Sequence, residues 1–192
     1  DRVSPTVMSV VRAEADYTNA GTVDFTVTFS EDVTGVDVDG SDFSLVASVV
    51  DATIDSVSGS NSVYTVTVST GTTGGVIGLV LATVPTIQDA VGNDLTNSTV
   101  SGVNQNYTIA STEVLLVGGD VFVADIREAT ADDLTLSVVG GDLVISSASG
   151  AIAAGMGVNR ISDSSVSVAL NDVTGSDGIT VTTGALDDTV TI

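Results

Sequence analysis

The chain has 192 residues, of which 43% are hydrophobic and only 4% aromatic, and its formal net charge at pH 7 is -21. It contains neither cysteine nor histidine, which excludes disulfides, thiol chemistry, zinc sites built on those residues and a Ser-His-Asp triad. The 25 acids against four arginines exclude a nucleic-acid partner, because phosphate binding depends on lysine and arginine. The same acidity also serves simply to keep a valine-rich protein in solution.

Alternating valine and threonine residues predict short strands over residues 1–110. In residues 22–30, Val23, Phe25, Val27 and Phe29 share one face and polar residues the other, which is typical of a half-buried strand. Residues 63–69 repeat this pattern after a Gly-Ser-Asn-Ser turn. The other predicted strands are residues 7–13, 42–46, 52–57, 76–82 and 105–110. Seven strands about ten residues apart favour a β-sandwich, with one short helical turn at residues 86–90.

The composition changes near Ala110, so we predict two domains, residues 1–110 and 111–192. In the second domain Phe122 is the only aromatic residue. Residues 115–125 and 136–146 each contain an apolar run, a Gly-Gly-Asp turn and another apolar run. A Gly-Gly turn between such runs predicts a hairpin, whereas its recurrence suits the stacked coils of a β-solenoid. The predicted class is therefore all-β, a sandwich followed by a smaller β-rich domain that is either hairpins or the start of a solenoid.

Two acidic segments are candidate calcium sites. The first contains Asp37, Asp39 and Asp42, whose carboxylates are ligands that Ca²⁺ prefers. Its spacing fails the EF-hand template, because Asp42 stands where that loop needs glycine. Aspartate and glycine are also ordinary turn residues, so a solvated turn is the alternative.

The second acidic segment contains Asp89, Asn93 and Asp94. Their side chains are able to tie a loop together through hydrogen bonds to nearby amides. Alternatively, they present oxygen ligands for Ca²⁺ at the end of the sandwich, where a neighbouring module would lie. Both interpretations stay open at this point.

Residues 1–110 resemble the bacterial Ig-like repeats of large cell-surface and adhesin-type proteins. The matching stretches are SPTVMSV (4–10), TVDFTVTFSEDVTGVDVDGSDFSL (22–45), SGSNSVYTVTV (58–68) and IQDAVGNDL (87–95). The last resembles the family's Asp-x-x-Gly-Asn loop, carried here by Asp89, Gly92 and Asn93. The resemblance implies an Ig-like sandwich, tandem neighbours and calcium at module junctions.

We therefore expect an extracellular structural or adhesive module of a large surface protein, extending or assembling a stalk, biofilm fibre or lattice. Its expected partners are neighbouring modules, copies of the same protein or surface glycans. No apolar run approaches the roughly 20 residues that span a membrane, so we expect no membrane insertion. With scattered arginines and no visible cleft, we expect no enzyme activity.

Two alternatives remain. In one, the chain is a filament subunit whose N-terminal segment, residues 1–11, adds as a strand to a neighbour's sheet. In the other, it is a carbohydrate-binding module. Sugar recognition needs exposed aromatic platforms, for which Tyr17, Tyr64 and Tyr107 are the tyrosines available.

Overall fold

The computed structural model describes residues 3–37, 42–83, 85–96, 105–127, 131–184 and 187–192. Over these residues the regular secondary structure consists of strands and one 3-10 turn, η1 (Leu170–Asp172). The predicted all-β class is therefore confirmed. The described part holds no helix long and apolar enough to cross a membrane. The chain divides into two compact units. The first comprises Asp1–Asp16, Ala20–Gly71 and Val76–Tyr107, and the second Tyr17–Asn19, Thr72–Gly75 and Thr108–Ile192.

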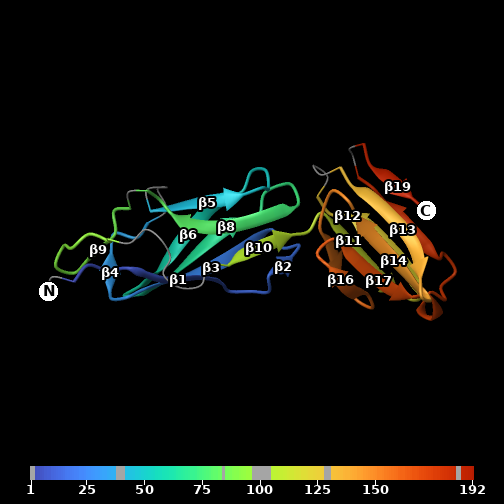
Figure 1. Ribbon diagram of the computed structural model, residues 1–192, viewed down its shortest axis with the longest axis horizontal. Coiled ribbons are helices and arrows are strands. Elements are labelled where there is room, and N and C mark those ends of the chain that lie inside the picture. The colour runs from blue at the N-terminus through green and yellow to red at the C-terminus, as the bar shows by residue number, and fades with distance from the viewer. Residues whose placement is uncertain (1–2, 38–41, 84, 97–104, 128–130, 185–186) are drawn as a thin grey trace. The chain divides into compact units, whose positions relative to one another are not determined.

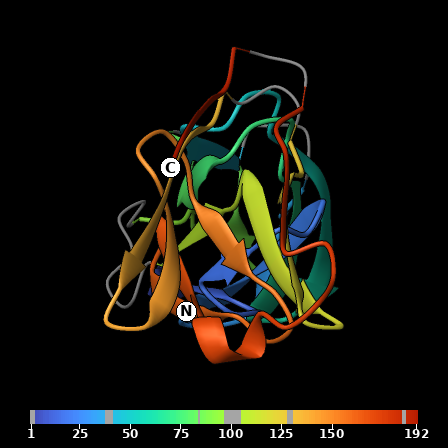
Figure 2. The ribbon, with the colours of Figure 1, turned by 90° about the vertical axis from the view of Figure 1, so that its right-hand side faces the viewer.

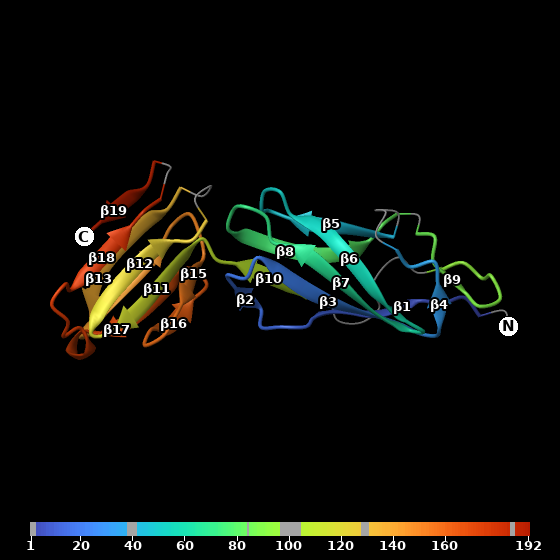
Figure 3. The same cartoon turned by 180° about the vertical axis from the view of Figure 1, so that it is seen from behind.

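Ten strands lie within residues 7–109 and form two four-stranded sheets and one two-stranded sheet (Figures 1 and 3). They are β1 (Val7–Arg12), β2 (Tyr17–Thr18), β3 (Thr22–Phe29), β4 (Val33–Thr34), β5 (Phe43–Ala47), β6 (Thr53–Ser60), β7 (Val63–Ser69), β8 (Gly75–Leu81), β9 (Gln88–Asp89) and β10 (Asn106–Ile109). The orders in the larger sheets are β1-β3-β7-β6 and β2-β10-β8-β5. The small sheet pairs β4 with β9.

The alternating pattern of residues 22–30 forms β3, where every second side chain is buried. Phe25 is fully buried at its centre, and its ring meets that of Tyr107 on β10 edge-on, with the centroids 5.1 Å apart. This contact joins the two larger sheets. Each of the seven predicted strands is present, with its ends shifted by no more than a few residues.

The predicted helical turn at residues 86–90 is wrong. Gln88 and Asp89 form β9, which pairs antiparallel with β4 through Val33↔Asp89 and Thr34↔Gln88. The side chain of Asp89 binds the amides that follow it, so the chain reverses in a hydrogen-bonded loop instead of continuing as a helix.

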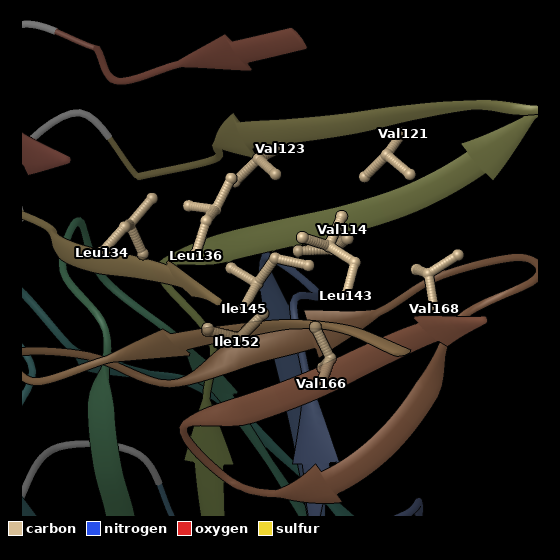
Figure 4. Packing of buried hydrophobic residues seen from close by; sticks show 10 residues of the cluster. All are labelled: Val114, Val121, Val123, Leu134, Leu136, Leu143, Ile145, Ile152, Val166 and Val168. Carbon is tan, nitrogen blue, oxygen red and sulfur yellow. The ribbon is translucent and has the colours of Figure 1, made fainter. Parts of the chain in front are cut away.

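The second unit also has two sheets, ordered β15-β11-β12-β18 and β16-β17-β14-β13-β19. The strands are β11 (Thr112–Val117), β12 (Asp120–Asp125), β13 (Asp133–Val139), β14 (Asp142–Ser147), β15 (Ile152–Ala154), β16 (Asn159–Ser162), β17 (Ser165–Ala169), β18 (Ile179–Thr182) and β19 (Thr189–Thr191). Figure 2 shows this unit end-on, with η1 as the short coiled ribbon. Both sheets contribute valine, leucine and isoleucine to one buried cluster, shown in Figure 4. The unit is thus a second sandwich with an aliphatic core.

The Gly-Gly-Asp turns form hairpins, and the solenoid alternative is wrong for the described residues. β11 pairs antiparallel with β12, and β13 with β14. Each connection is a two-residue loop whose glycines, Gly118-Gly119 and Gly140-Gly141, all have positive φ. Such loops suit the right-handed twist of the flanking strands, and glycine adopts positive φ without steric cost. A solenoid would instead require parallel stacking of successive coils.

The N-terminal segment is not available for strand donation in this structure. Val7 and Val10 are fully buried, and β1 pairs antiparallel with β3 over Val7–Arg12. Donating this strand to a neighbour would remove both valines from their own core. The premise of the filament alternative, an N-terminal strand that is free to join a neighbour's sheet, is therefore wrong for residues 7–11, which belong to β1.

Candidate functional site

The loop after β9 is organised around the buried carboxylate of Asp89. Its Oδ1 accepts hydrogen bonds from the amides of Val91 (2.9 Å) and Asn93 (2.8 Å), and its Oδ2 from the side-chain amide of Asn93 (2.7 Å). The Asp89 amide in turn donates to the Asn93 carbonyl, and Gly92 donates to the Asp89 carbonyl. The prediction that Asp89 and Asn93 tie this loop together is confirmed.

These contacts shift the acid–base equilibrium of Asp89. Burial opposes ionisation of the carboxyl group, but hydrogen bonds from the backbone and side chain of Asn93 and from nearby amides outweigh it. The pKa of Asp89 is therefore lowered below its ordinary value. The unfolded chain then binds the proton more tightly than the folded one, so this stabilisation is complete above the ordinary aspartate pKa of about 4. It is lost as the pH falls through the lower, folded-state value.

Replacing Asp89 by asparagine is expected to lower the urea midpoint of unfolding at pH 7. The substitution removes the charge and turns an amide group toward the Asn93 side-chain donor, so one hydrogen bond is lost. The difference between the two proteins should shrink as the pH falls below about 4, because the unsubstituted carboxylate is then neutralised as well. Urea unfolding at pH 7, 5 and 3 measures this.

Asp94→Asn is the matched control, because Asp94 lies in the same loop but is exposed. Its side chain accepts a hydrogen bond from Gln88 on the surface (2.7 Å). We expect its midpoint to follow that of the unsubstituted chain at each pH. A pH-independent effect of Asp89→Asn would contradict the proposed role of the Asp89 charge.

A polar hollow lies beside this loop, lined by Glu31, Asp32, Asp89, Ala90 and Val91. Glu31 and Asp32 follow β3, so the small sheet of β4 and β9 brings them near Asp89 although the chain separates them by more than fifty residues. Neither acid is among the predicted calcium ligands. Only the pairing of β4 with β9, two strands too short to show a pattern, places them there.

Asp42 is the second organising carboxylate, and it is fully buried. Its Oδ2 accepts from the Asp37 amide (2.9 Å), and its Oδ1 from the amide (2.7 Å) and hydroxyl (3.1 Å) of Thr86. Asp37 itself is exposed, and Asp39 lies outside the described residues. Asp42 therefore fastens the start of β5 to the segment that leads into β9.

No group of three or more acids in the described ranges is arranged to hold a metal ion. Asp42 and Asp89 bind backbone amides, while Asp37 and Asp94 lie exposed. The contacts thus support the loop-tying interpretation of these residues. Calcium binding stays a prediction.

Two of the three tyrosines considered for sugar binding are buried and form hydrogen bonds within the protein. Tyr64 is buried, and its hydroxyl donates to the Val33 carbonyl (3.0 Å). Tyr107 is fully buried and accepts hydrogen bonds from the amides of Ala13 (3.0 Å) and Glu14 (3.1 Å). The hydroxyl itself donates to the carboxylate of Glu14. Burial, followed by this hydrogen bond to the Glu14 side chain, raises the pKa of Tyr107 to about 12, so the hydroxyl stays neutral. Tyr17 is half-buried. Tyr64 and Tyr107 are therefore unavailable to a glycan, and the carbohydrate-binding alternative depends on Tyr17.

Sequence reasoning missed the residues around Tyr107. Arg12 on β1 donates from its amide to the Gln105 side chain (3.0 Å) and from its guanidinium group to the Asn106 carbonyl (2.6 Å). The Gln105 amide donates to the Val10 carbonyl (3.2 Å). We call these contacts between residues 10–12 and 105–106 the β1–β10 clasp. Its partners are more than ninety residues apart, and no local pattern joins them.

Comparison with known proteins gives few matches. No family model matches the chain, and no curated protein matches it. Among solved structures it is similar to the N-terminal part of the bacterial S-layer protein SbsC, with 15% sequence identity, 87% of this chain covered and a TM-score of 0.34. The chain spans 44% of the length of that solved chain.

Proposed function

We propose that this chain is a load-bearing extracellular module of a large surface protein. It would extend or assemble a stalk, fibre or lattice together with neighbouring modules or copies of the same protein. Two sandwiches in one chain, each with its own core, support this role. The observation that carries the proposal is the β1–β10 clasp in the first unit.

The clasp binds the first strand of the first sandwich directly to its last strand. β1 is an edge strand of its sheet, with β3 on one side. Residues 105 and 106 bind it through a backbone–backbone hydrogen bond and two contacts of Arg12. Tension applied to the two ends of this sandwich would load β1 and β10 first. The hydrogen bonds of the clasp would then share the load, and they would have to break together before β1 separates from β10.

The Ig-like family and calcium belong to the same proposal. The predicted family resemblance implies tandem modules, and the buried Asp42 and Asp89 loops supply the firm turns that such modules need. Calcium would bind in the hollow lined by Glu31 and Asp32 only together with oxygens of a neighbouring module, because no group of three or more acids among the described residues is arranged to hold a metal ion by itself. Its role would be to stiffen the contact with a neighbouring module.

Stretching single molecules of the whole chain between its ends tests the load-bearing role. We expect Gln105→Ala to lower the force at which the first unit unfolds, because it removes the acceptor for the Arg12 amide. Forced unfolding is governed by the unfolding rate, so this test reports on the clasp more directly than equilibrium stability does.

Gln88→Ala provides the matched control. Gln88 is exposed on β9, where its side chain binds Asp94 outside the clasp. Its unfolding force should equal that of the unsubstituted chain. If Gln105→Ala and Arg12→Ala leave the force of the first unit unchanged, the clasp does not bear load and the proposal fails.

A further inference from the structure

Residues 106–108 read Asn-Tyr-Thr, which matches the acceptor sequence for N-linked glycosylation. All three residues lie on β10. Alternate side chains of a strand point to opposite faces, and Tyr107 is fully buried. Asn106 and Thr108, the two residues that the acceptor sequence requires, therefore both lie on the outer face of the sheet.

The side chain of Asn106 is not used by the fold. Asn106 is exposed, and its carboxamide forms no hydrogen bond with any residue that the structure describes. Arg12 binds the backbone carbonyl of Asn106 instead. By contrast, the side-chain amide of Asn93 is held by the carboxylate of Asp89. A sugar bonded to Nδ2 of Asn106 would therefore replace no side-chain hydrogen bond of the folded chain.

Gly78 on the neighbouring strand β8 leaves the space in which the Asn106 carboxamide lies. A Cβ at this glycine would collide with Oδ1 of Asn106. Gly78 pairs with Val46 on β5, which is 63% exposed, and Val76 lies two residues earlier on β8 and is 40% exposed. Cross-strand partners, like residues two apart on a strand, share a face. The carboxamide thus lies on a face with exposed valines, and an attached sugar would cover part of this apolar surface.

The folded chain, however, does not offer residues 106–108 to an enzyme. β10 lies between β2 and β8 in its sheet (Figure 1). The Tyr107 ring is buried against Phe25, with the ring centroids 5.1 Å apart. A glycosyl transferase has to hold the acceptor segment in its own site, which requires β10 to be out of the sheet. Any sugar on Asn106 is therefore added before the first unit folds.

We propose that Asn106 is a site of N-linked glycosylation, modified before the first unit folds. The donor is an oligosaccharide joined through its anomeric carbon C1 to a lipid-linked phosphate. Nδ2 of Asn106 forms a bond to C1 while the bond from C1 to the phosphate oxygen breaks. The phosphate leaves with that electron pair, and a base of the transferase takes the proton from Nδ2. This inference goes beyond the load-bearing role, because a chain glycosylated at Asn106 need carry no load.

Mass spectrometry of the chain isolated from the cells that make it tests the proposal. We expect the peptide that contains Asn106 to carry the mass of an oligosaccharide. Asn97 begins a second matching sequence, Asn-Ser-Thr, which lies outside the described residues. Fragmentation that keeps the sugar attached to its residue assigns it to Asn97 or to Asn106. An unmodified Asn106, including the case in which Asn97 alone is modified, overturns the proposal.

Thr108→Ser and Thr108→Ala, produced in the same cells, form a matched pair. Serine keeps the hydroxyl group that the acceptor sequence requires, and alanine removes it. We expect Thr108→Ser to keep the fraction of chains glycosylated at Asn106 within about threefold and Thr108→Ala to lower it at least tenfold. Asn97→Gln should leave this fraction unchanged. Equal glycosylation of the two Thr108 variants would show that residues 106–108 are not read as an acceptor sequence.

The order of glycosylation and folding is tested with unmodified chain made in a host that lacks such a transferase. The purified chain is incubated with membranes of the native cells, which supply the transferase and its lipid-linked donor. We expect Phe25→Ala, which removes the ring packed against Tyr107, to be modified at Asn106 at least tenfold faster than the unsubstituted chain. Ile145→Ala is the control, because Ile145 is buried in the second unit. Equal rates for Phe25→Ala and the unsubstituted chain would contradict modification before folding.

Discussion

Replacing Phe25 by alanine is expected to cost the first unit about 3–5 kcal/mol in unfolding free energy. The side chain is fully buried on β3, and its ring meets Tyr107 edge-on at a centroid distance of 5.1 Å. Removing it leaves a cavity between the two larger sheets, at the point where they contact. Because typical domains are stable by only about 5–15 kcal/mol, this one substitution should bring the first unit close to unfolding.

Tyrosine fluorescence during urea unfolding measures this loss, since the chain contains no tryptophan and Tyr64 and Tyr107 are buried in the first unit. Phe25→Leu is the control. It keeps most of the apolar volume and should cost less than about 1.5 kcal/mol if the core repacks. A loss below about 1 kcal/mol for Phe25→Ala would mean that Phe25 does not join the sheets.

Replacing Ile145 by alanine is expected to cost the second unit about 2–5 kcal/mol. Ile145 is fully buried on β14, within the cluster to which both sheets contribute (Figure 4). The core contains only aliphatic side chains, and most of them are β-branched valines and isoleucines whose restricted rotamers limit how far the neighbours can fill the gap. Most of the cavity should therefore remain.

Ile161→Ala is the matched control, because Ile161 lies on β16 in the same unit and is 58% exposed. We expect its effect to stay within about 0.5 kcal/mol. Hydrogen–deuterium exchange of peptides from β13 and β14 reports local stability directly. Equal protection of these peptides in the two variants would show that Ile145 is not the centre of that core.

Much of the fold follows from local pattern, as β3 illustrates. Four apolar residues at alternate positions suffice to predict a half-buried strand, because side chains on a strand point to opposite faces in turn. The two-residue strands β4 and β9 carry no such period, and their pairing was therefore not predicted. The Gly-Gly turns were compatible with both a hairpin and the coils of a β-solenoid, because the spacing of the turns does not show whether the flanking strands pair antiparallel or parallel.

In the candidate site, too, the contacts between residues close in sequence were predictable and those between distant residues were not. Asp89 and Asn93 are four residues apart, so an Asx-type loop was predictable from sequence. The link from Asp42 to Thr86 spans 44 residues, and an acidic run around Asp42 gives no sign of it. Whether a carboxylate in such a run contacts solvent, an ion or a backbone amide depends on which distant segment the fold places beside it.

The pairing of β18 and β19 has a consequence for the order in which the second unit is assembled. The hairpins β11–β12 and β13–β14 close over two-residue loops and need only local encounters. By contrast, β18 pairs in parallel with β12, and β19 with β13, across 58 and 56 positions of sequence. Such distant pairings form slowly, because chain entropy is lost before contacts compensate for it. As the polypeptide emerges amino end first, the hairpins should fold early, and β18 and β19 should dock last.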